Sequence, residues 1–393
     1  MRRSRAVRTL GLAAVCLLFQ EVALRLVFPL PEIRGLNRID YMSIGLEGGD
    51  TKAIRSIRVV HDDVLDRVRV VHRLNEYGFR GGRWAARKAP GAQRVLFVGD
   101  SFVEGGLTPD GETIPEGFEA DLRRQGLYVE ALNLGVSGAG LESELRLIVD
   151  AAPQLRPDIL LLVVYANDLP ADVGVPRPRS FGTYPAWKPR FLELLAMARN
   201  REQLPWRWPW RMANFLQPVP SPNNPWSDPE FERQFAEHVS PRVLALMKSA
   251  RFSPYRMGGS QYLETDLRTP FDLRGALGGL REYLSRLGCR LLVVYIPERG
   301  TVTNYYQRFE REFSLGYPEG VDMTGPAYHL HRRLLREQCG DTGVPFLDLT
   351  DFIKREEDAG RHLYFDYDDH LSGPASSLAG GLVARWFAGA GGG

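Results

Sequence analysis

The sequence predicts an α/β fold: a doubly wound sheet of about five parallel strands with helices on both faces. Five short segments are apolar almost throughout, as expected for strands that are buried on both faces. Amphipathic segments with helical periodicity alternate with them along the chain. With 393 residues and 44% hydrophobic content, the chain is long and apolar enough to bury a large core.

The predicted elements follow one another in a regular order. We expect strands at residues 95–98, 129–134, 157–168, 289–297 and 345–350. We expect helices at residues 112–127, 142–155, 273–288, 327–340 and 375–387. In the first of these helices, Ile114, Phe118 and Leu122 recur at the spacing of one helix face.

Two segments interrupt this alternation. Residues 31–93 are polar with short β-branched runs, which predicts a β-rich lead-in. Residues 170–270 are dense in proline and tryptophan, and a connection of this length predicts an inserted lobe with some helix in residues 231–250. The lobe is either a packed decoration or a lid or sugar-binding wall. The sheet domain then comprises residues 94–169 and 271–393.

The N-terminal segment, residues 1–30, predicts a membrane anchor. Four arginines lie among the first eight residues, and a mostly apolar run follows from Thr9 to Phe28. As a helix, such a run just spans a ~30 Å hydrocarbon layer, and the positive-inside rule places the rest of the chain outside the cytoplasm. Glu21 and Arg25 interrupt the run but are spaced to pair on one helix face. A cleaved export signal is the alternative, with the same destination.

Composition excludes several classes of function. Fifty basic against 48 acidic residues leave a net charge of +2, so we do not expect nucleic acid as a partner. The three cysteines, Cys16, Cys289 and Cys339, have no metal-ligand spacing. We therefore expect neither a structural zinc nor a disulfide framework, although Cys289 and Cys339 could pair.

Candidate functional residues follow the predicted strands. In a doubly wound sheet, ligands bind beyond the carboxyl ends of the strands. Ser101 directly follows the first strand, a glycine-rich stretch at 133–140 follows the second, and Asn167 ends the third. The last connection carries His370 together with three acids, Asp366, Asp368 and Asp369.

This set of side chains fits acyl transfer through a serine. A serine hydroxyl needs an imidazole to take its proton, and the imidazole needs a carboxylate to fix its tautomer. The backbone N–H groups of Ser101 and Gly138 and the side-chain amide of Asn167 could stabilise an oxyanion. A metal site built on His370 and its neighbouring acids is a chemical alternative, but it would leave Ser101 and Asn167 without a role.

These residues resemble the four blocks of the GDSL-type, or SGNH, hydrolase family, which centre on Ser, Gly, Asn and His in that order. Here GDSF supplies Ser101, NLGVSGAG supplies Gly138, YAND supplies Asn167 and DDH supplies His370. The resemblance implies that the sheet is flavodoxin-like. The resemblance covers residues 94–167 and 276–388.

Other parts of the chain refine the resemblance. The apolar run ending in ALRL and the stretch NEYGFRG at residues 75–81 resemble a bacterial, membrane-anchored, envelope-facing branch of the family. Phe102 replaces the usual Leu, which we expect to be a packing change. Many members place the acid three residues before the histidine, where this chain has Tyr367, whereas a branch that places it two residues before matches Asp368. Among the other histidines, His362 is a second candidate for the base.

The resemblance implies a serine esterase that needs no metal or organic cofactor. Ser101 would attack the ester, His370 would act as general base and Asp368 would orient the imidazole, while Ser101, Gly138 and Asn167 would hold the oxyanion. The implied substrate is an acyl ester of a cell-envelope carbohydrate. Two alternatives stay open: an O-acyltransferase with the same triad, and a non-catalytic envelope assembly or glycan-binding protein.

Overall fold

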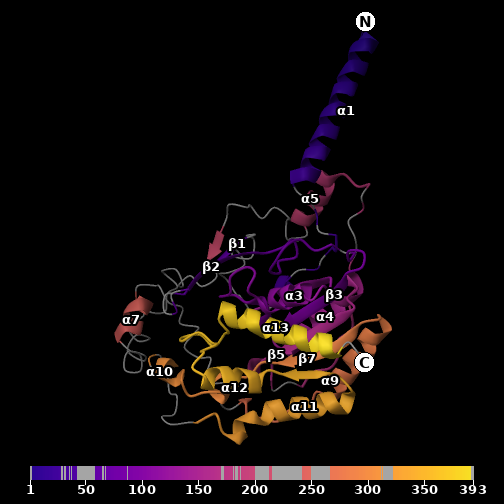
Figure 1. The fold of residues 1–393 in the computed structure, drawn as a ribbon. Helices are drawn as coiled ribbons and strands as arrows, with labels where there is room; N and C mark the ends of the chain where they lie inside the picture. Colours follow the sequence, from indigo (N-terminus) through magenta and orange to yellow (C-terminus); the bar gives the residue numbers. More distant parts are fainter. Residues whose placement is uncertain are drawn as a thin grey trace.

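The structure of the protein is a computed structural model. It describes residues 2–41, 58–179, 181–199, 212–214, 241–248, 266–312 and 322–390, apart from gaps inside these ranges at 28–29, 31, 35, 37, 64–65, 67, 86, 170–171, 182–184, 186 and 311. A sheet covered by helices forms the body of the molecule, and a long N-terminal helix projects from it (Figure 1).

The body is built on a five-stranded parallel sheet. Its strands are β3 (Gln93–Gly99), β4 (Val129–Gly135), β5 (Ile159–Val164), β7 (Arg290–Tyr295) and β8 (Phe346–Asp348). They lie in the order β4-β3-β5-β7-β8, and every neighbouring pair is parallel. This is the strand order of a flavodoxin-like sheet, with its switch point between β3 and β5, and it confirms the predicted fold class.

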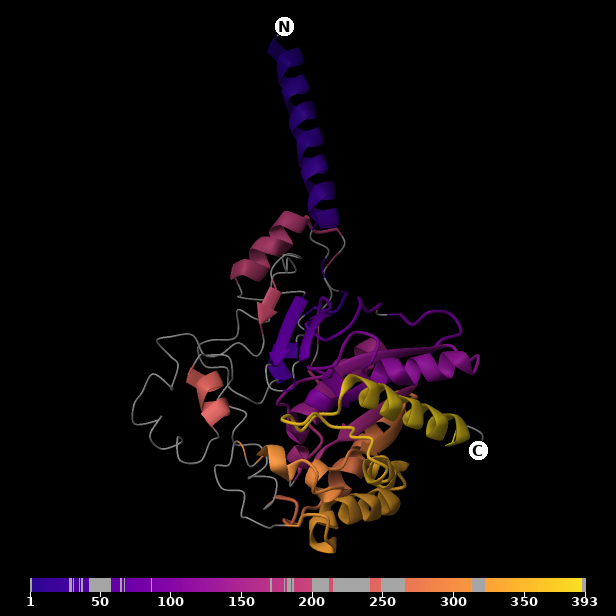
Figure 2. The same ribbon diagram turned by 60° about the vertical axis from the view of Figure 1, so that its left-hand side comes forward.

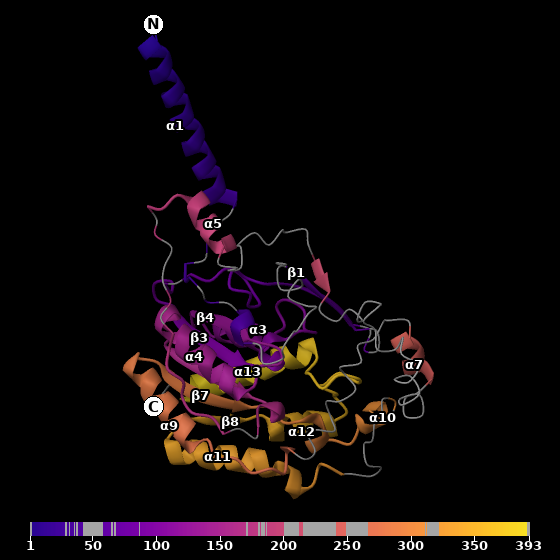
Figure 3. The same ribbon diagram turned by 180° about the vertical axis from the view of Figure 1, so that it is seen from behind.

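Helices cover both faces of this sheet (Figures 1 and 3). The helices α4 (Leu141–Leu155), α9 (Arg274–Arg286) and α11 (Leu330–Thr342) pack in one apolar cluster, and α3 (Ile114–Arg124), α12 (Thr350–Asp358) and α13 (Gly373–Ala390) pack in the other. Alternate residues of β3 divide between the clusters: Leu96 and Val98 join the first, while Val95 and Phe97 join the second. A strand buried on both faces must be apolar throughout, which is why the run from 95 to 98 is uninterrupted.

The structure departs from the predicted elements at the strand ends. The strand expected at 157–168 stops at Val164, because residues 166–168 form a single 3-10 turn. The strand expected at 345–350 stops at Asp348, whose carboxylate accepts the N–H of Thr350 at 2.9 Å and starts α12. We did not predict α12, because its nine residues follow that short strand without an intervening loop.

The lead-in and the inserted lobe share a second, smaller sheet. In the lead-in, β1 (Arg58–Asp63) pairs antiparallel with β2 (Val68–Arg73), as the β-branched runs predicted. From the lobe, β6 (Met212–Asn214) adds parallel to β1. The lobe also contributes α5 (Arg190–Arg199) and α7 (Pro241–Lys248). Most of its tryptophan-rich stretch, and with it the choice between decoration and lid, lies outside the described residues.

The stretch NEYGFRG ties the lead-in to the chain that follows Ser101. The side-chain oxygen of Asn75 accepts two backbone N–H groups of the turn after it, at 2.9 and 3.1 Å. The guanidinium of Arg80 is buried and donates to the carbonyls of Gly105 and Thr108. This stretch therefore supports the segment that carries the candidate nucleophile.

The N-terminal helix α1 (Arg2–Val27) occupies most of the segment expected to be a membrane anchor and projects from the body in all three views (Figure 2). Glu21 and Arg25 pair within it, as their spacing predicted, and both also contact the lobe. Glu21 accepts the backbone N–H of Arg190, and Arg25 donates to the carbonyl of Lys188. Among the helices in the described part of the chain, none has both the length and the apolar character needed to span a bilayer. The predicted membrane-spanning helix is therefore not found there.

The pairing left open for Cys289 and Cys339 does not occur. Both are free thiols buried in the same apolar cluster. Burial raises the pKa of both thiols to about 12, so at neutral pH they are unreactive core residues.

At Gly135, the strand β4 packs closely against the backbone that follows Ser101. A Cβ atom at Gly135 would lie 2.0 Å from the backbone nitrogen of Glu104. We expect Gly135→Ala to displace the helical turn that begins at Ser101, lowering the free energy of unfolding by about 1–3 kcal/mol. Chemical denaturation measures this change.

The matched control is Gly275→Ala in α9, where an added Cβ meets nothing within 4 Å. Because Gly275 is exposed in a helix, alanine there should be neutral or stabilising by roughly 0.5–1 kcal/mol. Equal stability of the two variants would show that β4 does not need glycine at this point.

Candidate active site

Ser101 lies at the point where β3 turns into a short helix. Gly99 ends the strand, and Asp100 begins the turn by accepting the N–H of Phe102 at 2.9 Å. The helix α2 (Ser101–Glu104) follows at once. A Cβ at Gly99 would lie 2.5 Å from a side-chain carbon of Val103, so the tight turn depends on glycine. Ser101 is half-buried at this strand end, where the sequence placed it.

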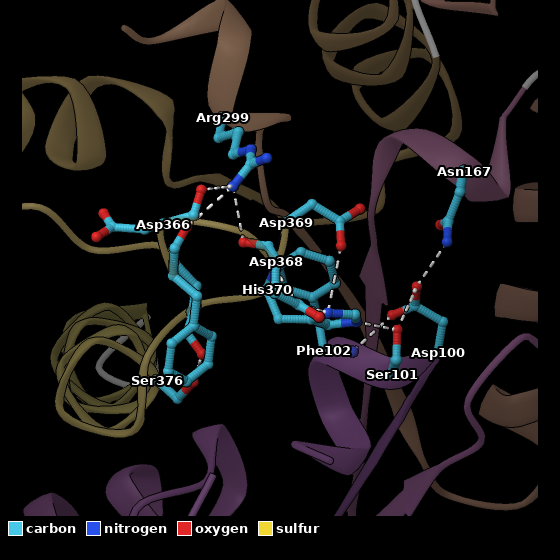
Figure 4. A network of polar contacts seen from close by, with 12 residues as sticks. Asp100, Ser101, Phe102, Asn167, Arg299, Asp366, Asp368, Asp369, His370 and Ser376 are labelled. Carbon is cyan, nitrogen blue, oxygen red and sulfur yellow. Dashed lines mark hydrogen bonds and ion pairs between the residues drawn. The ribbon is translucent and has the colours of Figure 1, made fainter. Parts of the chain in front are cut away.

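His370 reaches Ser101 from the last connection of the chain. The loop that carries it is closed at its base, where the N–H of Phe365 donates to the carbonyl of His370 at 3.0 Å and Tyr364 bridges to Leu371. Nε2 of His370 lies 2.5 Å from Oγ of Ser101, although 269 positions separate them (Figure 4). The structure thus brings together the hydroxyl and the imidazole that the sequence singled out.

Asp368 is the acid that contacts the imidazole. Its Oδ1 is hydrogen-bonded to Nδ1 of His370 and also accepts the backbone N–H of His370 at 2.9 Å. The side chain of Tyr367 does not contact the imidazole in the described contacts, and its hydroxyl lies 2.7 Å from Oε1 of Glu312. Asp369, to which we gave no role, places Oδ1 3.3 Å from the same Nδ1. The imidazole therefore faces two carboxylates.

These carboxylates change the proton affinity of the imidazole. Burial alone would lower the pKa of His370, but the charges of Asp368 and Asp369 outweigh burial and raise this pKa to about 9. The Phe102 ring lies 4.8 Å from the imidazole ring and 4.1 Å from the Tyr165 ring, centroid to centroid. Phe102 is therefore a packing residue, as expected, and it packs directly on the candidate base.

Asn167 reaches the same place from the end of β5. It lies in the 3-10 turn η3 (Ala166–Asp168), and its Nδ2 donates to Oδ2 of Asp100 at 3.0 Å. Oγ of Ser101 lies 3.4 Å from that same oxygen (Figure 4). An amide NH2 carries two hydrogens, so this bond orients Asn167 and leaves its second hydrogen to be donated beside Ser101.

Gly138 lies in a tight turn after β4. The N–H of Ala139 donates to the carbonyl of Val136 at 2.9 Å, and Gly138 adopts a φ of 72°, a conformation that favours glycine. The turn begins beside the end of β3, because the N–H of Val136 donates to the carbonyl of Gly99 at 3.0 Å. The role of the Gly138 N–H as an oxyanion donor stays a prediction.

Glu104 links the candidate nucleophile to the glycine turn, and we did not predict it. It is buried at the end of α2, and its Oε2 accepts both the N–H and the hydroxyl of Ser137, at 2.8 and 2.5 Å. Arg38 of the lead-in, fully buried, donates to that oxygen at 2.5 Å. No sequence motif marks this contact, because its partners come from three separate segments.

A group of buried carboxyls lies behind the site. Asp100, Glu144 and Asp168 all have raised pKa values, chiefly because burial disfavours their charged forms. Repulsion among the three carboxyls acts in the same direction. The raised pKa values favour the neutral forms of these carboxyls behind the place where an oxyanion would form.

The metal alternative narrows to three residues. Asp368, Asp369 and His370 place ligand atoms within 4.8 Å of one another, whereas Asp366 is not in this group. Both imidazole nitrogens already contact protein groups, Nδ1 with Asp368 and Nε2 with Ser101. The arrangement therefore fits proton transfer better than metal binding.

His362, the second candidate for the base, belongs to a different cluster. Its Nδ1 lies 2.9 Å from an oxygen of Glu357, and its ring stacks on Tyr305 with centroids 3.4 Å apart. The contact with Ser101 comes from His370.

Comparison with known proteins finds a family match in part of the chain. Residues 97–252 match the model of the GDSL-like Lipase/Acylhydrolase family. No curated protein sequence matches the chain. Among solved structures, the chain is similar to an acetyl xylan esterase, AlAXEase, at 11% identity and a TM-score of 0.34, over 75% of this chain and 98% of that one.

A second solved structure is a two-domain esterase, CEX, active on acetylated mannans and co-crystallised with mannopentaose. It matches at 12% identity and a TM-score of 0.34, over 76% of this chain and 49% of that one. The match gives a GDSL-like lipase/acylhydrolase domain over residues 97–252, and it supports an enzyme that hydrolyses ester bonds.

Proposed function

We propose that the protein is a serine esterase that removes an acyl group from a cell-envelope carbohydrate through an acyl-enzyme. The distance of 2.5 Å between Oγ of Ser101 and Nε2 of His370 is the observation that supports the mechanism most directly. A hydroxyl at this distance from a nitrogen base can lose its proton as it attacks a carbonyl carbon.

The first half-reaction forms the acyl-enzyme. The Nδ1–H of neutral His370 donates a hydrogen bond to Asp368 and stays on nitrogen, while Nε2 takes the proton of Ser101 as Oγ bonds to the ester carbon. The carbonyl electrons move onto oxygen, and the N–H groups of Ser101 and Gly138 and the amide of Asn167 stabilise the resulting charge. When this intermediate collapses, the ester bond breaks and His370 gives its proton to the leaving sugar hydroxyl.

The second half-reaction restores the enzyme. His370 takes a proton from water, the water oxygen bonds to the acyl carbon, and the proton then passes to Oγ of Ser101 as the free acid leaves. An O-acyltransferase would differ at this step alone, with a sugar hydroxyl in place of water.

The carbohydrate part of the proposal is supported by the surroundings of the catalytic loop. Tyr367, in the loop itself, lies edge-on to Phe309 with centroids 5.1 Å apart, and the Arg242 guanidinium lies 5.5 Å from its ring centroid. Phe309 and Tyr367 are half-buried. Aromatic rings and charged donors at a surface suit the apolar faces and hydroxyl edges of sugars.

We also propose that the sheet domain lies outside the cytoplasm. Arginines concentrate in the first turns of α1, and its later side chains are apolar and exposed: Leu18 by 65%, Phe19 by 76% and Leu26 by 78%. Exposed apolar side chains grouped in this way are expected to contact an apolar partner. Alkaline phosphatase fused after the sheet domain should be active in intact cells; an active cytoplasmic reporter at the same position would contradict the proposal.

Labelling with a fluorophosphonate probe tests the nucleophile. The probe should bind Ser101 covalently in the purified protein, and the label should disappear in Ser101→Ala and in His370→Ala, because the hydroxyl needs the base to react. In-gel fluorescence with peptide mass spectrometry measures it. His362→Ala is the control, since His362 belongs to another cluster, and it should keep the label.

Each other outcome of this experiment favours a different function. A folded wild-type protein that never takes the label would point to the non-catalytic alternative. Labelling with slow release of p-nitrophenol from its acetate, accelerated by an added glycan acceptor, would point to the acyltransferase.

The raised pKa of His370 predicts the pH dependence. The general base must be neutral, so kcat/KM should rise with pH, reach half of its plateau near pH 9, the pKa that the carboxylates impose, and level off above it. Asp368→Asn removes the charge that raises the pKa of His370 most. In this variant, the rising limb of the kcat/KM profile should therefore move to lower pH. The substitution should also lower kcat by roughly 10³–10⁴-fold, because the imidazole loses the group that fixes its tautomer. Initial rates with p-nitrophenyl acetate measure both effects.

Asp369→Asn is the matched control. It removes a charge 3.3 Å from the same nitrogen without touching the hydrogen bond of Asp368. We expect the limb to move in the same direction with a much smaller loss of kcat. An unchanged limb in both variants would contradict the assignment of His370 as the base.

A further inference from the structure

The loop that carries Asp368 and His370 encloses a buried guanidinium. Arg299 lies in the turn after β7 and is only 2% exposed. Its Nη1 lies 2.9 Å from the carbonyl oxygen of Phe365, 3.3 Å from that of Asp366 and 2.8 Å from that of Asp368 (Figure 4). Three carbonyls of one short loop therefore point at a single nitrogen.

The other side of the guanidinium is fixed as well. Nε and Nη2 both donate to Oε1 of Glu310, at 2.9 and 2.7 Å, and the Tyr306 ring centroid lies 5.1 Å from the guanidinium carbon. Glu310 is itself only 8% exposed. A planar group bound along one edge and packed on an aromatic ring has little freedom, so Nη1 is a fixed point for the loop.

We propose that Arg299 is a positioning residue, which fixes the loop 365–370 so that Asp368 and His370 face each other and Ser101. The inference rests on the proposed function, since it concerns the same triad. Arg299 touches neither Ser101 nor the imidazole in the described contacts, and it acts through the backbone of Asp368.

The geometry explains why a backbone contact affects the triad. The carbonyl of Asp368 bonds to Arg299, while the carboxylate of the same residue bonds to the imidazole. The base of the loop is closed by backbone bonds, but between 365 and 370 its peptide groups turn inward toward Nη1. Without that donor the carbonyls would turn toward water, and a shift of this kind near 1 Å can cost about 100-fold in rate.

The experiment must separate positioning from loss of folding. Arg299→Met alone would leave Glu310 as an unpaired buried charge, which is strongly destabilising. The double variant Arg299→Met/Glu310→Met removes the pair together, and such replacements of buried ion pairs by apolar residues are often neutral in stability. We expect its unfolding midpoint to stay close to that of the wild type, while kcat falls about 100-fold with KM changed less than about twofold.

A second readout does not depend on turnover. In the double variant the contact between Asp368 and His370 should loosen, so the pKa of His370, followed by NMR titration of its ring, should fall from about 9 toward its ordinary value of 6.5. The rising limb of kcat/KM should move to lower pH in parallel. A residue that served folding alone would leave this pKa unchanged in a stable variant.

The chain offers a matched control at the opposite end of the sheet. Arg94, at the start of β3, is equally buried; its Nε donates to Glu130 at 2.9 Å and its Nη1 to the carbonyl of Leu155 at 2.8 Å. Arg94→Met/Glu130→Met also removes an arginine–glutamate pair and a bond from the guanidinium to a backbone carbonyl, but at the end of β3 that lies away from Ser101. It should keep the wild-type kcat and the wild-type pKa of His370.

Arg299→Lys covers the case in which the double variant does not fold. It keeps the charge opposite Glu310 but loses the planar donor, so kcat should fall about tenfold, with the limb moved in the same direction. A folded variant at position 299 with wild-type kcat and wild-type His370 pKa overturns the inference. The fluorophosphonate label separates the two failures. An unlabelled wild-type protein contradicts the proposed function. A labelled wild type whose variants at position 299 keep the wild-type kcat and His370 pKa contradicts the role of Arg299 alone.

Discussion

The site depends on one contact, between a hydroxyl at the end of the first sheet strand and an imidazole near the end of the chain. Ser101 lies at the edge where all five parallel strands end, and the loop after α12 brings Nε2 of His370 to within 2.5 Å of its Oγ. β3 lies between β4 and β5, so the segments after these three strands converge around Ser101. The glycine turn and Asn167 arrive by this route, and the His370 loop closes over them.

Electrostatics at the site balance carboxylates against a small number of buried cations. Asp368 and Asp369 favour the charged imidazole, whereas the carboxyls of Asp100, Glu144 and Asp168 have raised pKa values because burial disfavours their charge. The guanidiniums of Arg38 and Arg299 are buried against Glu104 and Glu310, so each buried cation has a carboxylate partner. Each pair also contacts a part of the site. Glu104 of the first pair bonds to Ser137 in the glycine turn, and Arg299 of the second bonds to the His370 loop.

Segments outside the sheet domain help to build the site. The lead-in supplies Arg38 to Glu104 and Arg80 to the chain after α2, and β6 of the lobe joins the sheet of the lead-in. Arg242 of the lobe donates to the hydroxyl of Tyr367 at 3.0 Å, three residues before His370. The family match ends at residue 252, before the last connection, so the base is placed by tertiary structure rather than by that match.

The sequence alone determined the fold class and most of the elements, because strands buried on both faces must be apolar throughout and helices that cover them must be amphipathic. It also located Ser101, Asn167 and His370, since residues after parallel strands share one edge of the sheet. It did not find Arg299, Glu104 or Arg38, because a buried ion pair between distant segments has no local pattern. Nor could it separate Asp368 from Asp369 by chemistry; the backbone of the loop decides which carboxylate meets Nδ1. The periodicity of apolar residues shows which side of an element is buried. The distances between segments far apart in the chain are set only when the sheet assembles.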